Sequence, residues 1–236
     1  DTGQTSCDDA DAGYYVDQTG QSTQTACLAG KYNPNTGSTS ISACIGASPG
    51  HYVNVLLGSG QSTQTACLAG TFNPQAGSTW NACIDAYAGY YVGQTGQSTQ
   101  TPCLAGTYQS DTGQTDCDNA DAGYYVSTTA QSSQTACLAG TYQASTGQTS
   151  CDDADAGYYV PSPAQSSQTA CSAGTYQANT GQASCDDADA GYYVSTTAQS
   201  SQTACLAGTY QSDTGQTDCD DADAGYYVST TAQSSQ

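Results

Sequence analysis

Apolar side chains in this 236-residue chain stand singly or in pairs between long polar stretches. No window shows the 3.6-residue apolar periodicity of an amphipathic helix. Short clusters that contain Tyr, Val and Thr alternate instead with turn sequences rich in Gly, Ser and Gln, and these clusters favour strands. Gly113, in a Thr-Gly-Gln sequence, suits a turn position with positive φ. The pattern therefore predicts many short strands joined pairwise by polar turns.

The cysteines divide the chain into repeats of about 34 residues. They stand at Cys7, Cys27, Cys44, Cys67, Cys83, Cys103, Cys117, Cys137, Cys151, Cys171, Cys185, Cys205 and Cys219. From Cys103 onward their gaps alternate between 14 and 20 residues, and residues 103–134 and 205–236 differ only at Asn119 and Asp221. A fixed period of this size predicts an array in which each repeat contacts mainly its neighbours.

Each repeat holds two similar halves, for example from Cys103 to Cys117 and from Asp121 to Cys137. Both halves share Ala-Gly, an aromatic residue, a polar turn and then Gln-Thr-x-Cys, so we expect one strand–turn–strand in each. Both ends of the sequence cut through a repeat, and we expect a longer array around it. The predicted repeats are a partial one at 1–26, divergent ones at 27–66 and 67–102, regular ones at 103–136, 137–170 and 171–204, and a truncated one at 205–236.

The composition is too poor in apolar residues for a conventional core. The chain has no Met, one Phe and one Trp, whereas ordering 34 residues costs about 50 kcal/mol at roughly 1.5 kcal/mol per residue. Disulfides reduce the entropy of the unfolded chain, by about 3 kcal/mol for a 15-residue loop. Zinc sites are disfavoured, because the chain has no C-x-x-C pair and its only histidine is His51. We expect an all-β, disulfide-rich, elongated tandem-repeat array with little helix, made in an oxidising, extracellular setting.

Thirteen cysteines leave two pairings open. One scheme joins Cys7 to Cys27, Cys44 to Cys67 and so on, and leaves Cys219 unpaired. The other scheme leaves Cys7 unpaired. It is favoured, because each disulfide would then close a Cys-x-x-Gly-x-Tyr loop into a self-contained module. Its pairs are Cys27–Cys44, Cys67–Cys83, Cys103–Cys117, Cys137–Cys151, Cys171–Cys185 and Cys205–Cys219.

The charge is almost entirely negative. The acidic residues are 21 Asp, the only basic residue is Lys31, and the net charge is -20. Nucleic acids and anionic membranes bind clustered Lys or Arg, so neither is an expected partner. No stretch approaches the ~20 apolar residues of a membrane span. Such a surface repels copies of itself unless salt or divalent cations screen it.

The spacing of Cys, Gly, Tyr and Cys resembles that of the ephrin-receptor-like and TNF-receptor-like cysteine-rich repeats. The resemblance is carried by Cys103/Gly106/Tyr108/Cys117, Cys137/Gly140/Tyr142/Cys151, Cys171/Gly174/Tyr176/Cys185 and Cys205/Gly208/Tyr210/Cys219. It implies an extracellular, elongated, disulfide-laddered protein with little regular secondary structure. The second half of each repeat departs from that family, because Asp-Ala-Asp-Ala stands where a cysteine is usual. The near-identical copying is similar to that of microbial surface or filament proteins.

A recurring aspartate cluster is the candidate metal site. Oxygen ligands at i and i+2 before a Gly resemble part of a calcium loop, although no Glu is present to close an EF-hand. The alternative is a solvated acidic connector whose side chains hold the turn. Apart from possible calcium no cofactor is expected; the candidate ligands are Asp9, Asp11, Asp153, Asp155, Asp187, Asp189, Asp221 and Asp223.

Two features are candidate interaction surfaces. The segment 49–57 is the most apolar in the chain, and in the Tyr-Tyr pairs one ring is expected to pack inward and the other to face glycans or another subunit. The alternatives are local packing of a longer loop and two rings that both cover a thin core. The residues concerned are His51, Val53, Val55, Leu56, Leu57, Tyr124 and Tyr125.

The sequence shows no catalytic constellation, with no recurring His, no recurring Lys base and no Arg. We therefore expect no enzyme, but a structural protein of the cell exterior or cell surface that forms a fibre, stalk or filament with copies of itself. The alternative is an adhesin or receptor-like ectodomain that binds glycans or proteins through residues 49–57 and the tyrosine rows.

Overall fold

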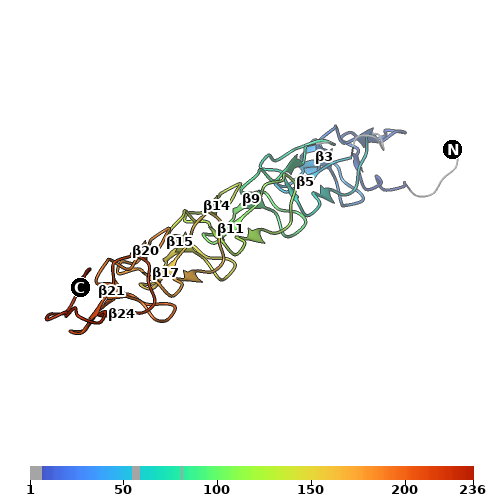
Figure 1. Cartoon of the computed structure of the whole chain (residues 1–236). Helices are drawn as coiled ribbons and strands as arrows, with labels where there is room; N and C mark the ends of the chain where they lie inside the picture. Colours follow the sequence, from blue (N-terminus) through green and yellow to red (C-terminus); the bar gives the residue numbers. More distant parts are fainter. Residues whose placement is uncertain (1–6, 55–58, 81) are drawn as a thin grey trace. The chain divides into compact units, whose positions relative to one another are not determined.

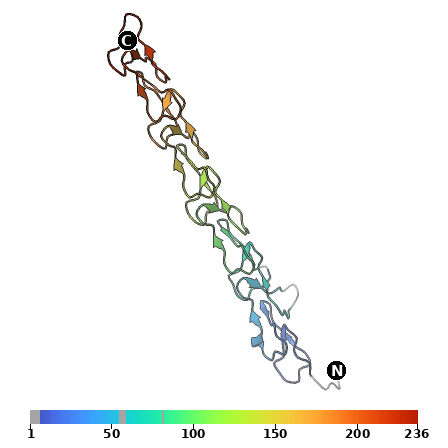
Figure 2. The same ribbon diagram turned by 90° about the horizontal axis from the view of Figure 1, so that it is seen from below.

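The computed structural model describes residues 7–54, 59–80 and 82–236. The chain divides into two compact units, which are described separately. The first comprises Asp1–Cys103, Tyr108–Asp118 and Ala130–Ser132, and the second comprises Leu104–Thr107, Asn119–Thr129 and Ser133–Gln236. In both units the hairpins follow one another in chain order (Figures 1 and 2).

The described residues form two-residue strands that pair antiparallel, together with one short 3₁₀ helix, η1 (Ile41–Ala43). The hairpins are β1 (Tyr14–Tyr15) with β2 (Thr25–Ala26), β3 (Lys31–Tyr32) with β4 (Ile45–Gly46), β5 (His51–Tyr52) with β6 (Thr65–Ala66), β7 (Thr71–Phe72) with β8 (Ile84–Asp85), β9 (Tyr90–Tyr91) with β10 (Thr101–Pro102), β11 (Thr107–Tyr108) with β12 (Asp118–Asn119), β13 (Tyr124–Tyr125) with β14 (Thr135–Ala136), β15 (Thr141–Tyr142) with β16 (Asp152–Asp153), β17 (Tyr158–Tyr159) with β18 (Thr169–Ala170), β19 (Thr175–Tyr176) with β20 (Asp186–Asp187), β21 (Tyr192–Tyr193) with β22 (Thr203–Ala204), and β23 (Thr209–Tyr210) with β24 (Asp220–Asp221). The predicted all-β, disulfide-rich repeat array is confirmed.

The structural period is 17 residues, half the sequence repeat. We call 137–153 and its equivalents the cysteine half-repeat, and 154–170 and its equivalents the aspartate half-repeat. The two types make the same backbone hydrogen bonds to the half-repeat that follows. Gly140 N donates to Val160 O over 2.8 Å, and 17 residues later Gly157 N donates to Gln177 O over the same distance. Both types are therefore one structural element with different side chains.

This equivalence corrects the alignment drawn from the sequence. The shared Gln-Thr-x-Cys motif suggested that the two closing cysteines of a repeat correspond. In the structure Cys137 corresponds to Ala154, and Cys151 corresponds to Gln168. The aspartate half-repeat therefore lacks both cysteines, and the motif similarity does not reflect structural equivalence.

Close stacking leaves room for only a thin core. A Cβ placed on Gly140, whose φ is +88°, would lie 2.2 Å from the carbonyl oxygen of Gly181 in the next cysteine half-repeat. The core itself is a series of small side chains, and Cys137, Ala154 and Val160 are fully buried.

In cysteine half-repeats, the position equivalent to Val160 is occupied by a buried amide side chain, such as that of Gln143. Its Nε2 donates to Ser150 O over 3.0 Å and its Oε1 accepts from Ser145 N over 3.0 Å, so the buried polar atoms are satisfied.

The six disulfides follow the favoured pairing, which leaves Cys7 unpaired, and their Cα–Cα distances range from 5.5 to 5.8 Å. They join Cys27–Cys44, Cys67–Cys83, Cys103–Cys117, Cys137–Cys151, Cys171–Cys185 and Cys205–Cys219. Cys7 is free and exposed. Each bridge joins consecutive cysteines, so each closes a loop within one cysteine half-repeat.

The tyrosine pairs differ from the expected division into one inward and one outward ring. Both members of the pair are half-buried in β13, and the same holds in β9, β17 and β21. Tyr226 and Tyr227, in the last half-repeat of the sequence, are 63 % and 83 % exposed. The following repeat thus covers both rings of a pair. This arrangement matches the alternative interpretation, in which both tyrosine rings cover the thin core.

The divergent repeats keep the same plan with local changes. Val53 is 1 % exposed and forms a parallel bridge with Thr79, so the proposal that it belongs to a contact surface is wrong. Val55, Leu56 and Leu57, from the same predicted surface, lie outside the described residues. Phe72 replaces the usual Tyr and packs edge-to-face on Tyr87, with ring centroids 6.0 Å apart.

Backbone strain recurs at one turn position. Ala130, Ala164, Ala198 and Ala232 have φ near +60°, where cysteine half-repeats carry glycine. A left-handed conformation costs an L-residue about 1–2 kcal/mol, and the gain from glycine is partly offset by its greater freedom in the unfolded chain.

We therefore predict that Ala198→Gly stabilises the protein by about 0.5–1 kcal/mol. The equivalent turn residue Gly181 (φ +73°) offers the matched reverse change, and Gly181→Ala should destabilise by a similar amount. Urea unfolding of the oxidised protein measures both. Equal midpoints for the two variants would contradict the prediction.

Candidate functional site

The aspartate half-repeat is closed by hydrogen bonds at the place where the cysteine half-repeat has its disulfide. Asp155 N donates to Gln168 Oε1 over 2.6 Å, and Gln168 Nε2 donates to Asp155 Oδ2 over 2.6 Å. Gln168 stands where Cys151 stands in the other type. We call this pair of bonds the aspartate–glutamine clamp. A bond from an amide to a carboxylate is charge-assisted and stronger than a neutral one.

The clamp recurs along both compact units. It joins Asp11–Gln24, Asp121–Gln134, Asp155–Gln168, Asp189–Gln202 and Asp223–Gln236. In the divergent repeats, Ser48 and Tyr87 replace the aspartate, and their backbone N–H groups still donate to Gln64 and Gln100 over 2.7 and 2.8 Å. The backbone bond is thus the common part of the closure, and the carboxylate adds the second bond.

The predicted calcium ligands occupy two different places. Asp153, Asp187 and Asp221 lie exposed in strands β16, β20 and β24, whereas the aspartates two residues later form clamps. Asp9 and Asp11 line a hollow of about 740 Å³. Within residues 7–54, 59–80 and 82–236, no three His, Cys, Asp or Glu side chains are grouped so that they could hold a metal ion. Calcium therefore stays a prediction of the sequence.

The carboxylates also affect a neighbouring phenol. Burial raises the pKa of Tyr176, and the carboxylates of Asp189 and Asp186 raise it further. Tyr176 pairs with Asp186 across the β19–β20 hairpin. The phenol therefore remains neutral at physiological pH, and it adds no charge to this acidic surface.

A row of exposed leucines is the feature that the sequence analysis did not single out. Each follows the first cysteine of a cysteine half-repeat, at the position that aspartate half-repeats give to the clamp aspartate. The exposed fractions are 69 % for Leu28, 73 % for Leu68, 70 % for Leu104, 72 % for Leu138 and 69 % for Leu206. At the same position in the remaining regular repeat stands Ser172.

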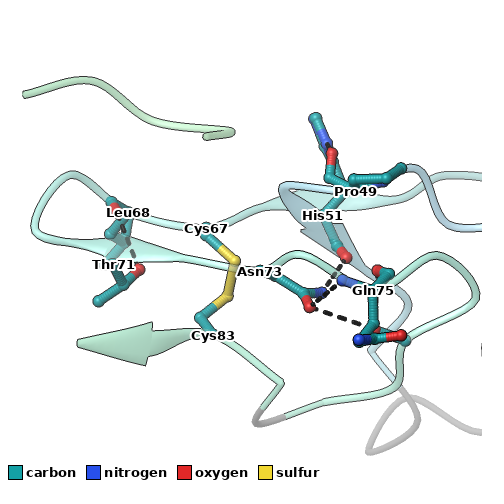
Figure 3. The surroundings of a disulfide bond; sticks show 9 residues. Pro49, His51, Cys67, Leu68, Thr71, Asn73, Gln75 and Cys83 are labelled. Carbon is teal, nitrogen blue, oxygen red and sulfur yellow. Dashed lines mark hydrogen bonds between the residues drawn. A yellow bond between two sulfur atoms is a disulfide. The ribbon is translucent and has the colours of Figure 1, made fainter. Parts of the chain in front are cut away.

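Two of these leucines line equivalent shallow hollows. In the second compact unit, a hollow of about 260 Å³ is lined by Tyr125, Ala136, Leu138, Thr141, Ser150 and Cys151. In the first, a hollow of about 290 Å³ is lined by Tyr52, Thr65, Ala66, Leu68, Thr71, Trp80 and Cys83. Figure 3 shows Leu68 and Thr71 beside the Cys67–Cys83 disulfide, with Thr71 Oγ1 donating to Leu68 O over 2.8 Å. Neither lining contains a charged side chain.

The residues proposed for interaction are placed unequally. Tyr125 lines a leucine hollow, and Tyr124 is half-buried in the same strand. His51 is half-buried; its Nδ1 lies 3.3 Å from Pro49 O, and its carbonyl accepts a bond from Asn73 Nδ2 over 2.9 Å (Figure 3). The leucines were missed because they are isolated in the sequence. The available signal was their invariable place after the first cysteine.

No protein-family model matches the chain, and a comparison with curated proteins finds no match. The resemblance to ephrin-receptor-like and TNF-receptor-like repeats therefore rests on cysteine, glycine and tyrosine spacing alone. Among the described residues, no helix has both the length and the apolar character needed to span a membrane.

The equivalence of the two closures predicts that a clamp can be replaced by a disulfide. In the double variant Ala154→Cys with Gln168→Cys, the new cysteines occupy the places of Cys137 and Cys151, and they should pair on oxidation. The added bridge should stabilise the protein by up to about 3 kcal/mol, less the contribution of the lost hydrogen bonds. Peptide mass mapping without reduction identifies the pair, and urea unfolding measures the gain.

The control for this variant is Ala154→Cys with Gln165→Cys, which places the second cysteine in the polar turn, out of register with Cys151. It should leave both introduced cysteines unpaired, in addition to Cys7. Unpaired thiols at positions 154 and 168 of the in-register variant would show that the two half-repeat types are not equivalent.

Proposed function

We propose that this chain is a structural repeat protein of the cell exterior, which self-associates as part of a fibre, stalk or filament. Its six local disulfides suit an oxidising compartment. The resemblance to extracellular cysteine-rich repeats points the same way. The proposal includes no catalytic role and requires no cofactor.

The observation that carries the proposal is that nearly identical repeats present the same apolar side chain to solvent. Leucines about 70 % exposed recur at one position of the fold in both compact units. Isolated exposed apolar residues are common on protein surfaces, but recurrence of the same one beside five of the six disulfides is typical of an interaction surface. Repetition in register suits a partner that is also repetitive.

The net charge sets a condition on self-association. At -20, copies of the chain repel one another at low ionic strength. The Debye length falls from about 30 Å at 0.01 M salt to about 3 Å at 1 M, and apolar contacts are not weakened by this screening. Assembly should therefore increase with salt.

We predict that the purified, oxidised chain forms larger particles as sodium chloride is raised from about 0.01 M to about 1 M. Light scattering measures the size, and negative-stain electron microscopy shows whether the particles are ordered. Polydisperse precipitate is the result expected of simple salting-out. A chain that stays monomeric at all salt concentrations would overturn the proposal.

A second function, binding of glycans as an adhesin, is favoured by the hollow around Leu68. Trp80 is 48 % exposed there, beside Tyr52 and the hydroxyls of Thr65 and Thr71. An aromatic face with nearby hydroxyl groups suits the apolar face and the hydroxyls of a sugar. This combination is confined to the divergent repeat.

If the adhesin function holds, a glycan panel should show binding that Trp80→Ala reduces at least tenfold. Ile41→Ala, which truncates another exposed apolar side chain of the first compact unit, is the matched control and should leave binding unchanged. Circular dichroism and disulfide mapping should show the same fold in both variants. Equal binding by the two variants would rule out the Trp80 hollow as a glycan site.

A further inference from the structure

The exposed leucines are not needed for folding, because the chain contains its own counterexample. Ser172 takes the leucine position in one repeat, and Thr175 N donates to its carbonyl over 3.0 Å. Thr141 N donates to Leu138 O over the same distance. The threonine hydroxyls also match, donating to these carbonyls over 2.9 Å in both repeats. Serine therefore supports the same turn, and the leucine side chain serves something outside the fold.

We propose that the leucine hollows of one chain are the contact surface for the leucine hollows of a second copy. This inference rests on the proposed self-association and identifies the surface that mediates it. The contact consists of the leucine, the tyrosine of the preceding hairpin and the small residues beside the disulfide. In the second compact unit these are Leu138, Tyr125, Ala136 and Thr141.

The charge distribution favours a second copy over a basic partner. A basic protein would be attracted by the exposed aspartates of β16, β20 and β24, whereas the linings of the two hollows contain no charged residue. Two copies can bring these hollows together without placing carboxylates in the contact itself. The desolvation cost of burying unpaired charges is thereby avoided.

Spacing and area also favour a second copy. A leucine side chain contributes roughly 120 Å², at about 30 Å² per carbon, so at 70 % exposure each offers roughly 80 Å². A stable interface needs about 800 Å² per partner, so one hollow is insufficient and several must engage together. The partner must then present apolar groups at the same interval. A second copy does so, because Leu104 and Leu138 recur in it at the same 34-residue spacing.

Association should therefore depend steeply on the number of leucines in the row, because linked weak contacts reinforce one another. Ser172 interrupts the row between Leu138 and Leu206. Replacing Ser172 by leucine should strengthen association, and replacing the neighbouring leucines by serine should weaken it. Both changes are compatible with the fold, since the chain already carries each residue at this position.

The experiment compares variants of the full oxidised chain by sedimentation velocity at about 1 M sodium chloride, the condition of strongest screening. The weakening variant combines Leu104→Ser, Leu138→Ser and Leu206→Ser. It should raise the concentration needed for half-assembly at least tenfold. Ser172→Leu should lower that concentration severalfold. Mass mapping of the six disulfides and circular dichroism verify the fold of each variant.

The matched control is Ser195→Leu, which adds the same side chain at an exposed position of an aspartate half-repeat that is not the leucine position. It should assemble like the unmodified chain. Equal promotion by Ser195→Leu and Ser172→Leu would overturn the inference in favour of general hydrophobicity. Undiminished assembly of the triple variant would also overturn it, while the proposed self-association would stand. A monomeric unmodified chain would refute both.

Discussion

Backbone hydrogen bonding between successive half-repeats is the constraint on which the rest of this structure depends. Gly140 and Gly157 each donate to a carbonyl 20 residues further on, and these bonds require the close approach that only a residue without Cβ permits. Little space then remains between half-repeats, and small side chains such as Cys137, Ala154 and Val160 fill it. A core of this size cannot stabilise the chain through apolar burial alone, so every half-repeat also needs a local closure.

Two chemically different closures meet that need at one position. A covalent bridge closes the cysteine half-repeat, and a charge-assisted pair of hydrogen bonds closes the aspartate half-repeat. Alternation divides the side-chain roles as well. The residue after the first position of a half-repeat is a bonded carboxylate in one type and a solvent-exposed leucine in the other. Acidic and apolar features therefore alternate at the same position of successive half-repeats.

Much of the fold could be predicted from the sequence, because cysteine spacing and glycine turns are local signals. The hairpins, the all-β class and a positive φ at Gly113 follow from them. The 17-residue equivalence could not be found, because Cys151 and Gln168 share no chemistry and only their hydrogen-bonded surroundings match. The alternative to a calcium loop was a solvated acidic connector, but pairing with β15 places Asp153 in strand β16. Of the candidate surface, Tyr125 was predicted and Leu138 was not, because a lone leucine carries no periodic signal.

The local closure of every disulfide has a consequence for how such a chain can be made and lengthened. Each bridge spans 14 to 17 residues and joins a cysteine to the next one along the chain. A segment can therefore oxidise as soon as it emerges during secretion, without waiting for distant sequence. Gain or loss of a 34-residue block by tandem duplication or deletion leaves every remaining bridge intact. Length can thus vary between generations without any change in the oxidative folding route.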